Sequence, residues 1–305
     1  MSRRTASSSS ALVPDDDLVN QPDFHGEVET NDEIPSQNAL RALDDYIVLD
    51  RYGKSHTFRS LYSARNVARR VLVIFVRHFL CGNCQEYLRT LSASMTTDAL
   101  LGLPVATSIV VIGCGKPELI GWYAETTGCE FSIFTDPTRQ LYRRLGMVCT
   151  LRSGPRPAYV QSKPAVQTVV AGVFQGLRKG TSGLANGKGA LKQVGGEFLF
   201  EPASGTLETP IASPLEWVGD DGGGGGGGGG IWKRREEGEA KCVTWCHRMR
   251  TTRDHVEVPE LMAILGLQGP GQPARDARRW QKAIATRKGT GSSMADQMSR
   301  GSGYI

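Results

Sequence analysis

Residues 71–88 read Val71-Leu72-Val73-Ile74-Phe75-Val76-Arg77-His78-Phe79-Leu80-Cys81-Gly82-Asn83-Cys84-Gln85-Glu86-Tyr87-Leu88. The first six residues are apolar and rich in β-branched side chains, which predicts a strand buried on both faces of a sheet. From Gly82 onward the order of residues fits a helix whose apolar side includes Cys84 and Leu88. Cys81 is therefore expected at the start of that helix.

A Cys-x-x-Cys between a buried strand and a helix is a candidate redox centre. Free backbone N–H groups and the positive end of the helix dipole stabilise a thiolate, so we expect the pKa of Cys81 to lie below its ordinary value of about 8.5. Cys81 is the predicted nucleophile. Cys84, one turn further on, is the predicted resolving thiol, which would attack a sulfenic acid or mixed disulfide on Cys81. The alternative is that both cysteines are structural core thiols.

Two neighbours are candidate site residues. His78 can accept the thiol proton of Cys81 or hold its thiolate in an ion pair, or it can be a structural histidine at a strand end. Arg77 can lower the pKa of Cys81 or bind an anionic substrate group, or it can face water. We predict no metal site, because Cys242 and Cys246 would lie about 13 Å apart on an extended strand, too far for Zn–S bonds of about 2.3 Å.

Composition narrows the class of protein. The 305 residues are 39% hydrophobic and 22% charged, with a net charge of +5. No apolar stretch approaches the roughly 18–20 residues that cross a bilayer, so we expect no membrane association. The basic residues form no stripe with interleaved aromatics, so nucleic acid is not an expected partner. The seven cysteines show no even, regular spacing, which indicates a reducing compartment and predicts a cytoplasmic location.

Strand and helix patterns alternate along the chain. We expect strands at residues 46–50, 71–76, 107–114, 131–134, 195–201 and 241–247, and helices at 61–68, 117–126, 138–145, 166–177 and 258–267, besides the helix after Cys81. Such alternation predicts βαβ units and an α/β fold, with a mainly parallel sheet and right-handed crossovers.

The domain boundaries follow from changes in composition. Residues 1–42 are polar and are predicted to be a disordered arm, and residues 43–267 the folded domain. A flexible insertion is expected at about residues 203–240, because Gly222 to Gly230 are nine consecutive glycines. Residues 268–305 are Gly-, Ser- and Arg-rich and are predicted to be a disordered tail.

Five motifs occur in order: residues 77–87 (RHFLCGNCQEY), 110–113 (VVIG), 134–137 (FTDP), 141–147 (LYRRLGM) and 195–198 (GGEF). On these motifs the chain resembles the AhpC/TSA antioxidant-enzyme-domain proteins, a peroxiredoxin-like group of the thioredoxin-like superfamily. The resemblance implies a thioredoxin-like fold, with a central mixed sheet and helices on both faces. It also implies reduction of a peroxide or disulfide by Cys81 and Cys84, with an external thiol reductant such as thioredoxin or glutathione. That scheme requires no organic cofactor.

The sequence departs from the wider pattern at two places. Typical peroxiredoxins have a Thr three residues before the reactive Cys and a Pro before that Thr, whereas this chain has His78 and no Pro in residues 71–76. Thioredoxins have a cis-Pro before the first hairpin strand, where this chain has Gln193-Val194-Gly195-Gly196. These differences leave an alternative open: a non-enzymatic thioredoxin-fold module that binds partners or senses redox state.

Overall fold

A computed structural model of the chain describes residues 33–64, 67–160, 189–203, 215–218, 231–234, 240–267 and 277–301. The predicted helix at residues 166–177 lies outside these ranges, as do residues 1–32 of the predicted arm and the nine-glycine run.

The elements follow one another in the order α1 (Gln37–Arg41), β1 (Ile47–Leu49), β2 (Ser55–Thr57), α2 (Phe58–Ser63), β3 (Arg70–Phe75), α3 (Gly82–Ser94), α4 (Thr97–Leu101), β4 (Thr107–Gly113), α5 (Leu119–Thr127), β5 (Ser132–Thr135), α6 (Gln140–Arg144), α8 (Gly189–Lys192), β6 (Gly196–Pro202), β7 (Leu215–Val218), β8 (Ile231–Arg234), β9 (Lys241–Arg248), α9 (Val258–Leu265), α10 (Ala277–Ala285), β10 (Thr290–Gly291) and α11 (Met294–Gly301).

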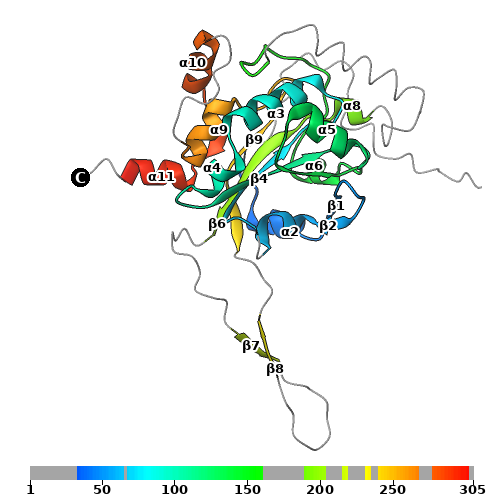
Figure 1. Ribbon diagram of the computed structural model, residues 1–305, viewed down its shortest axis with the longest axis vertical. Coiled ribbons are helices and arrows are strands. Elements are labelled where there is room, and N and C mark those ends of the chain that lie inside the picture. Colours follow the sequence, from blue (N-terminus) through cyan, green and yellow to red (C-terminus); the bar gives the residue numbers. More distant parts are fainter. Residues whose placement is uncertain are drawn as a thin grey trace, which may run out of the picture.

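The main sheet is mixed and has eight strands in the order β10-β9-β6-β3-β4-β5-β1-β2 (Figure 1). Strands β3, β4 and β5 are parallel, and the other neighbours are antiparallel. The prediction of a mainly parallel sheet is therefore wrong, because the later strands add antiparallel to β3 and β1 adds antiparallel to β5. At the carboxyl end of β3, Phe75 pairs with Ile112 of β4 and with Gly196 of β6. The loop that follows β3 therefore begins between β4 and β6, at the carboxyl end of the parallel strands.

Helices cover both faces of this sheet. Successive side chains of β3 point to opposite faces, so Leu72 and Ile74 pack with α3, α5 and α9. Val71, Val73 and Phe75 pack on the other face with α1, α2 and α6. This arrangement confirms the predicted α/β class, and the burial of all six residues of β3 explains its continuous apolar sequence.

The folded part extends beyond residue 267, so the predicted disordered tail is wrong for residues 277–301. There β10 adds to β9, with Thr290 opposite Cys246. The glycines that suggested disorder allow a close approach instead: a Cβ at Gly289 would lie 2.0 Å from the ring of Trp245, and one at Gly291 would lie 2.1 Å from a backbone oxygen. Residues Gln37–Arg41, within the predicted arm, are likewise helical.

The predicted insertion contains a two-stranded ladder in its described part. Strands β7 and β8 are antiparallel, with Trp217 opposite Trp232, and Figure 1 shows them below the eight-stranded sheet. In the described part of the chain, no helix has the length and apolarity required to cross a bilayer.

Candidate active site

Cys81 is the N-cap residue of α3, as its position after the buried strand predicts. Its backbone is extended, with φ −80° and ψ 109°, and its carbonyl accepts the N–H of Gln85 at 3.0 Å. The residue is 5% exposed. The pKa of Cys81 lies well below its ordinary value, because the hydrogen bond from Cys84 and the positive charge of the nearby Arg77 outweigh the effect of burial.

Cys84 lies one turn into α3 and is fully buried. Burial, together with the hydrogen bond to Cys81, raises the pKa of Cys84 well above its ordinary value. The two pKa shifts have opposite signs because the cysteines share one proton. Cys84 carries this proton and uses it in a hydrogen bond to the thiolate of Cys81. Both residues are free thiols. The structure therefore brings the two predicted cysteines together as a donor and an acceptor.

Arg77 is buried against the cysteines and does not face water. Its Nη1 donates to Cys81 Sγ at 3.3 Å, while Nη2 and Nε donate to the carbonyls of Leu191 at 2.6 Å and Gln193 at 3.1 Å. Three hydrogen bonds fix the guanidinium in one orientation. Cys114, a core thiol whose pKa burial raises to about 12, donates to the Arg77 carbonyl at 2.8 Å. The strand ends thus hold a positive charge beside Cys81.

His78 lies in the same loop and is buried. Burial lowers the pKa of His78 to about 4, and the positive charge of Arg77 acts in the same direction. Its Nδ1 atom has no hydrogen-bond partner among the described residues. A neutral imidazole cannot form the ion pair with Cys81 that the sequence suggested as one alternative, although it can still accept a proton.

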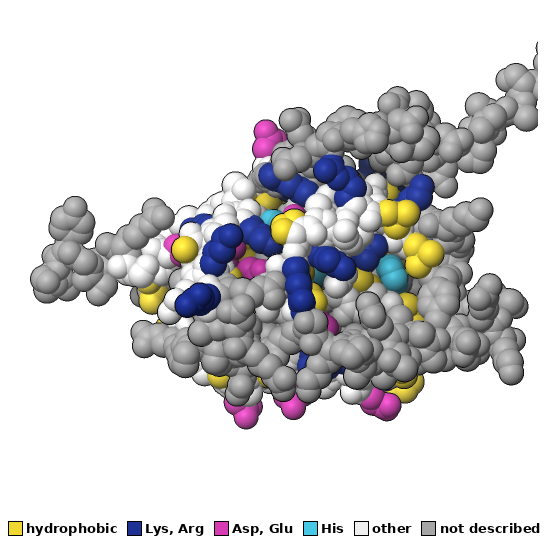
Figure 2. All heavy atoms as spheres, turned by 90° about the horizontal axis from the view of Figure 1, so that it is seen from above, with side chains coloured by type: hydrophobic (Ala, Val, Ile, Leu, Met, Phe, Trp, Pro, Cys, Tyr) yellow, Lys and Arg dark blue, Asp and Glu magenta, His cyan; other side chains and the backbone are white. Residues whose placement is uncertain are grey.

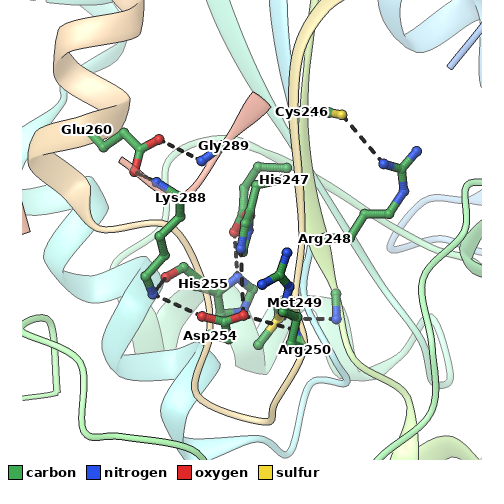
Figure 3. Close-up of polar contacts among 12 residues, drawn as sticks. Cys246, His247, Arg248, Met249, Arg250, Asp254, His255, Glu260, Lys288 and Gly289 are labelled. Atoms are coloured by element: carbon green, nitrogen blue, oxygen red, sulfur yellow. Dashed lines mark hydrogen bonds and ion pairs between the residues drawn. The ribbon is translucent and has the colours of Figure 1, made fainter. Parts of the chain in front are cut away.

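A buried polar chain behind Cys84 was not predicted from the sequence. Nε2 of His255 lies 3.4 Å from Cys84 Sγ, and Nδ1 of His255 lies 2.6 Å from Glu197 Oε1. The other carboxylate oxygen of Glu197 lies 2.8 Å from Nδ1 of His247, whose Nε2 is 3.7 Å from Asp254 Oδ2. Figure 3 shows His247, Asp254 and His255 facing one another across the loop that follows β9. We call Cys84, His255, Glu197, His247 and Asp254 the buried relay.

Opposite charges hold the far end of the buried relay. Burial by itself raises the pKa of Glu197, but His255 and His247 outweigh burial and lower it to about 2. Burial likewise lowers the pKa of His247, but Asp254 and Glu197 outweigh it and raise the pKa to about 9. Lys288 Nζ binds Asp254 Oδ1 at 3.1 Å. At neutral pH two carboxylates thus face one imidazolium and one ammonium.

Two features of the sequence point to the site and its buried relay. The protein has only five histidines, and three of them, His78, His247 and His255, lie within the site. Glu197 lies in β6, a strand whose residues are all buried, where an ionised carboxylate is costly without a partner. No three His, Cys, Asp or Glu side chains of the described ranges are arranged to hold a metal ion.

The surface around the site is basic. Figure 2 views the molecule from the end that is uppermost in Figure 1, where α3 and α8 lie, and Lys and Arg side chains gather over this face. Two backbone hydrogen bonds link the segment at residues 150–152 to two other parts of the chain. Thr150 N donates to the Lys192 carbonyl at 2.7 Å, and Thr252 N donates to the Arg152 carbonyl at 2.7 Å. Arg152 is exposed and Lys192 is half-buried.

A mixed sheet with helices on both faces, and a Cys-x-x-Cys at the start of the helix after the first parallel strand, define a thioredoxin-like protein. Residues 59–208 match the family model described as AhpC/TSA antioxidant enzyme. The chain belongs to the AhpC/TSA family, which confirms the resemblance inferred from the motifs.

Individual relatives agree with this family. Peroxiredoxin-like 2C of Mus musculus is 32% identical over 195 residues, which cover 60% of this chain and 81% of the relative. Peroxiredoxin-like 2C of Takifugu rubripes is 30% identical over 170 residues, covering 54% of this chain and 70% of the relative. Among solved structures, Xanthomonas campestris peroxiredoxin Q is similar at 14% identity with a TM-score of 0.31, covering 55% of this chain and 80% of that one.

Proposed function

We propose that the protein is a thiol oxidoreductase that reduces a peroxide or a disulfide through Cys81 and Cys84. The observation that carries the proposal is the environment of Cys81. Its sulfur lies at the N-terminus of a 13-residue helix, 3.3 Å from the Arg77 guanidinium, with the Cys84 thiol donating to it. Each of these contacts favours the thiolate, which is the nucleophilic form of cysteine.

With a peroxide, the Cys81 thiolate attacks one oxygen of the O–O bond. An S–O bond forms, the O–O bond breaks, and the leaving alkoxide takes a proton to become an alcohol, so Cys81 becomes a sulfenic acid. Cys84 then attacks the Cys81 sulfur. An S–S bond forms, the S–O bond breaks, and hydroxide leaves with the Cys84 proton as water. The peroxide is reduced by two electrons and the two thiols are oxidised to one disulfide.

With a disulfide, the first attack instead gives a mixed disulfide on Cys81 and releases one substrate thiolate. Attack by Cys84 releases the second thiolate and closes the same Cys81–Cys84 bond. In both cases an external thiol reductant, such as thioredoxin or glutathione, must reduce that bond to complete a cycle. The Lys and Arg side chains that gather on the face shown in Figure 2 suit substrates or reductants that carry negative charge.

The experiment is to treat the purified protein with one equivalent of hydroperoxide or of a small disulfide, digest it, and map the cysteine crosslinks by mass spectrometry. We expect a Cys81–Cys84 disulfide that thioredoxin or glutathione reverses. Cys81→Ser should abolish oxidation, and Cys84→Ser should stop at a sulfenic acid or mixed disulfide. Cys129→Ser, a buried cysteine outside the pair, is the matched control. Absence of the crosslink in the wild-type protein contradicts the proposal.

A second function is supported by the small exposure of the pair. Cys81 is 5% exposed and Cys84 is fully buried, which suits a thioredoxin-fold module that binds partners or senses redox state without turnover. Titration of thiolate absorbance near 240 nm distinguishes the two functions, with Cys81→Ser as the blank. A Cys81 that titrates at its ordinary pH and reacts slowly supports the binding or sensing module.

The state of the cysteines also supports the proposed location in the cytoplasm. All seven are free thiols, as expected of a chain that works in a reducing compartment. Fractionation followed by alkylation of the thiols in intact cells tests this location.

A further inference from the structure

We propose that His255 is the general base that takes the proton from Cys84 when Cys84 closes the disulfide, and that Glu197 positions His255 for this step. The inference rests on the proposed thiol chemistry of Cys81 and Cys84, and it concerns the second half of that reaction.

The geometry of His255 is that of a base aimed at a thiol. Nε2 lies 3.4 Å from Cys84 Sγ, within reach of an S–H···N hydrogen bond. Nδ1 lies 2.6 Å from the carboxylate of Glu197. An ionised carboxylate only accepts hydrogen bonds, so the proton between these two groups lies on Nδ1. The lone pair of Nε2 is then directed at Cys84.

The imidazole has little freedom to turn away. It is fully buried and stacks on the ring of Tyr87 from α3, with centroids 4.3 Å apart and planes 5° apart. The ring of Tyr159 meets the His255 ring in an edge-to-face arrangement, with centroids 6.4 Å apart. Lys288 Nζ binds the His255 carbonyl at 3.0 Å. The ring contacts come from α3 and from the segment that ends at residue 160, and the C-terminal segment holds the backbone of the same residue, so three parts of the chain position His255.

Charged groups of both signs lie around the ring of His255. Glu197 and Asp254 are already balanced by His247 and Lys288. After His255 accepts the Cys84 proton, Glu197 lies 2.6 Å away to stabilise the new charge.

The oxidation of Cys81 determines when Cys84 gives up its proton to His255. In the reduced protein the single proton of Cys84 is donated to the Cys81 thiolate. Once Cys81 is a sulfenic acid or a mixed disulfide, its negative charge is gone and it no longer holds that proton. The Cys84 S–H then transfers its proton to His255 Nε2, and the Cys84 thiolate attacks Cys81. The S–S bond forms as the S–O or S–S bond to the leaving group breaks. The leaving group departs on the side of Cys81 opposite Cys84 and takes a proton from solvent, and His255 then gives the Cys84 proton to solvent.

Stopped-flow oxidation tests the assignment. Diamide is a suitable probe because a thiolate adds to its N=N bond, and a second thiol then displaces the hydrazine to leave a disulfide. In His255→Gln we expect adduct formation on Cys81 within about twofold of wild type, and disulfide closure slower by about 10²-fold, the usual contribution of a general base. Glu197→Gln should slow closure in the same direction.

The pH profile of closure separates a base from a structural residue. In His255→Gln the closure rate should rise about tenfold per pH unit between pH 6 and pH 8, because solvent hydroxide must remove the proton, whereas wild type should rise less steeply. His56→Gln is the matched control, since His56 also binds a carboxylate, that of Asp50 at 3.0 Å, outside the site. Wild-type closure rates and profile in folded His255→Gln overturn the proposal.

A spectroscopic test does not depend on turnover. We expect ¹⁵N NMR of the imidazoles to show His255 protonated at Nδ1 and unprotonated at Nε2, with the Nε2 signal moving in Cys84→Ala. A proton on Nε2 in the reduced protein overturns the role of His255. If Cys81 reacts with neither diamide nor peroxide while the tautomer is as expected, the proposed function fails and the hydrogen-bond geometry stands.

Discussion

The imidazolium of His247 should make the stability of the fold depend on pH in a defined direction. Its pKa is raised to about 9 from an ordinary value of about 6.5. A raised folded-state pKa stabilises the fold fully below pH 6.5 and loses its effect as pH rises through 9. At 1.36 kcal/mol per pKa unit, this difference corresponds to about 3 kcal/mol of unfolding free energy.

The perturbation is His247→Gln, and the assay is urea unfolding at pH 6, pH 8 and pH 10. At pH 6 the variant should be less stable than wild type by about 3–5 kcal/mol, because Glu197 and Asp254 lose a buried cationic partner. By pH 10 the difference between the two proteins should shrink by about 3 kcal/mol. Cysteines that titrate in this range are common to both proteins and cancel in the comparison.

His56→Gln is again the control. The side chain of His56 is 29% exposed in its pair with Asp50, and a pair so open to water contributes at most about 1 kcal/mol. A stability difference between wild type and His247→Gln that stays constant from pH 6 to pH 10 would refute the argument that His247 is an imidazolium held by two carboxylates.

Three other substitutions, with Gly121→Ala as a control, test separate parts of the fold and the site. Arg77→Met should raise the pKa of Cys81, because it removes the guanidinium at 3.3 Å, and unchanged thiolate absorbance against pH would contradict this. Gly195→Ala should cost at least about 2 kcal/mol in urea unfolding, since its Cβ would lie 1.8 Å from a backbone oxygen of β3. Gly121→Ala, with no atom within 4 Å of the added Cβ, should be neutral or stabilising. Lys288→Met should lower stability by about 1 kcal/mol through its lost carboxylate partner, and an unchanged unfolding midpoint would show that this pair is not stabilising.

Local sequence was enough to predict the elements that position Cys81. The apolar run at residues 71–76 corresponds to β3, Arg70–Phe75, and the helical periodicity after Gly82 corresponds to α3. Each of these features depends on residues within a few positions of one another, where side-chain period and capping preference act directly.

Composition was a poor guide to the C-terminal segment. Glycine and serine between charged residues suggested disorder, yet residues 277–301 contain two helices and a strand. Glycine loses much backbone entropy on ordering, but it also allows a backbone to approach a buried ring, as Gly289 approaches Trp245. Which effect prevails depends on whether a surface is present to receive the glycine.

Sequence alone therefore predicted the family, the fold class and the position of Cys81 at the start of its helix, because those features are encoded by neighbours along the chain. The groups that act on Cys84 were decided by tertiary structure. His255 is 171 positions from Cys84 and 58 from Glu197, and no periodicity relates positions so far apart. They meet because β6 and the loop after β9 pack against α3, where a buried carboxylate and its imidazoles must satisfy one another in the absence of water.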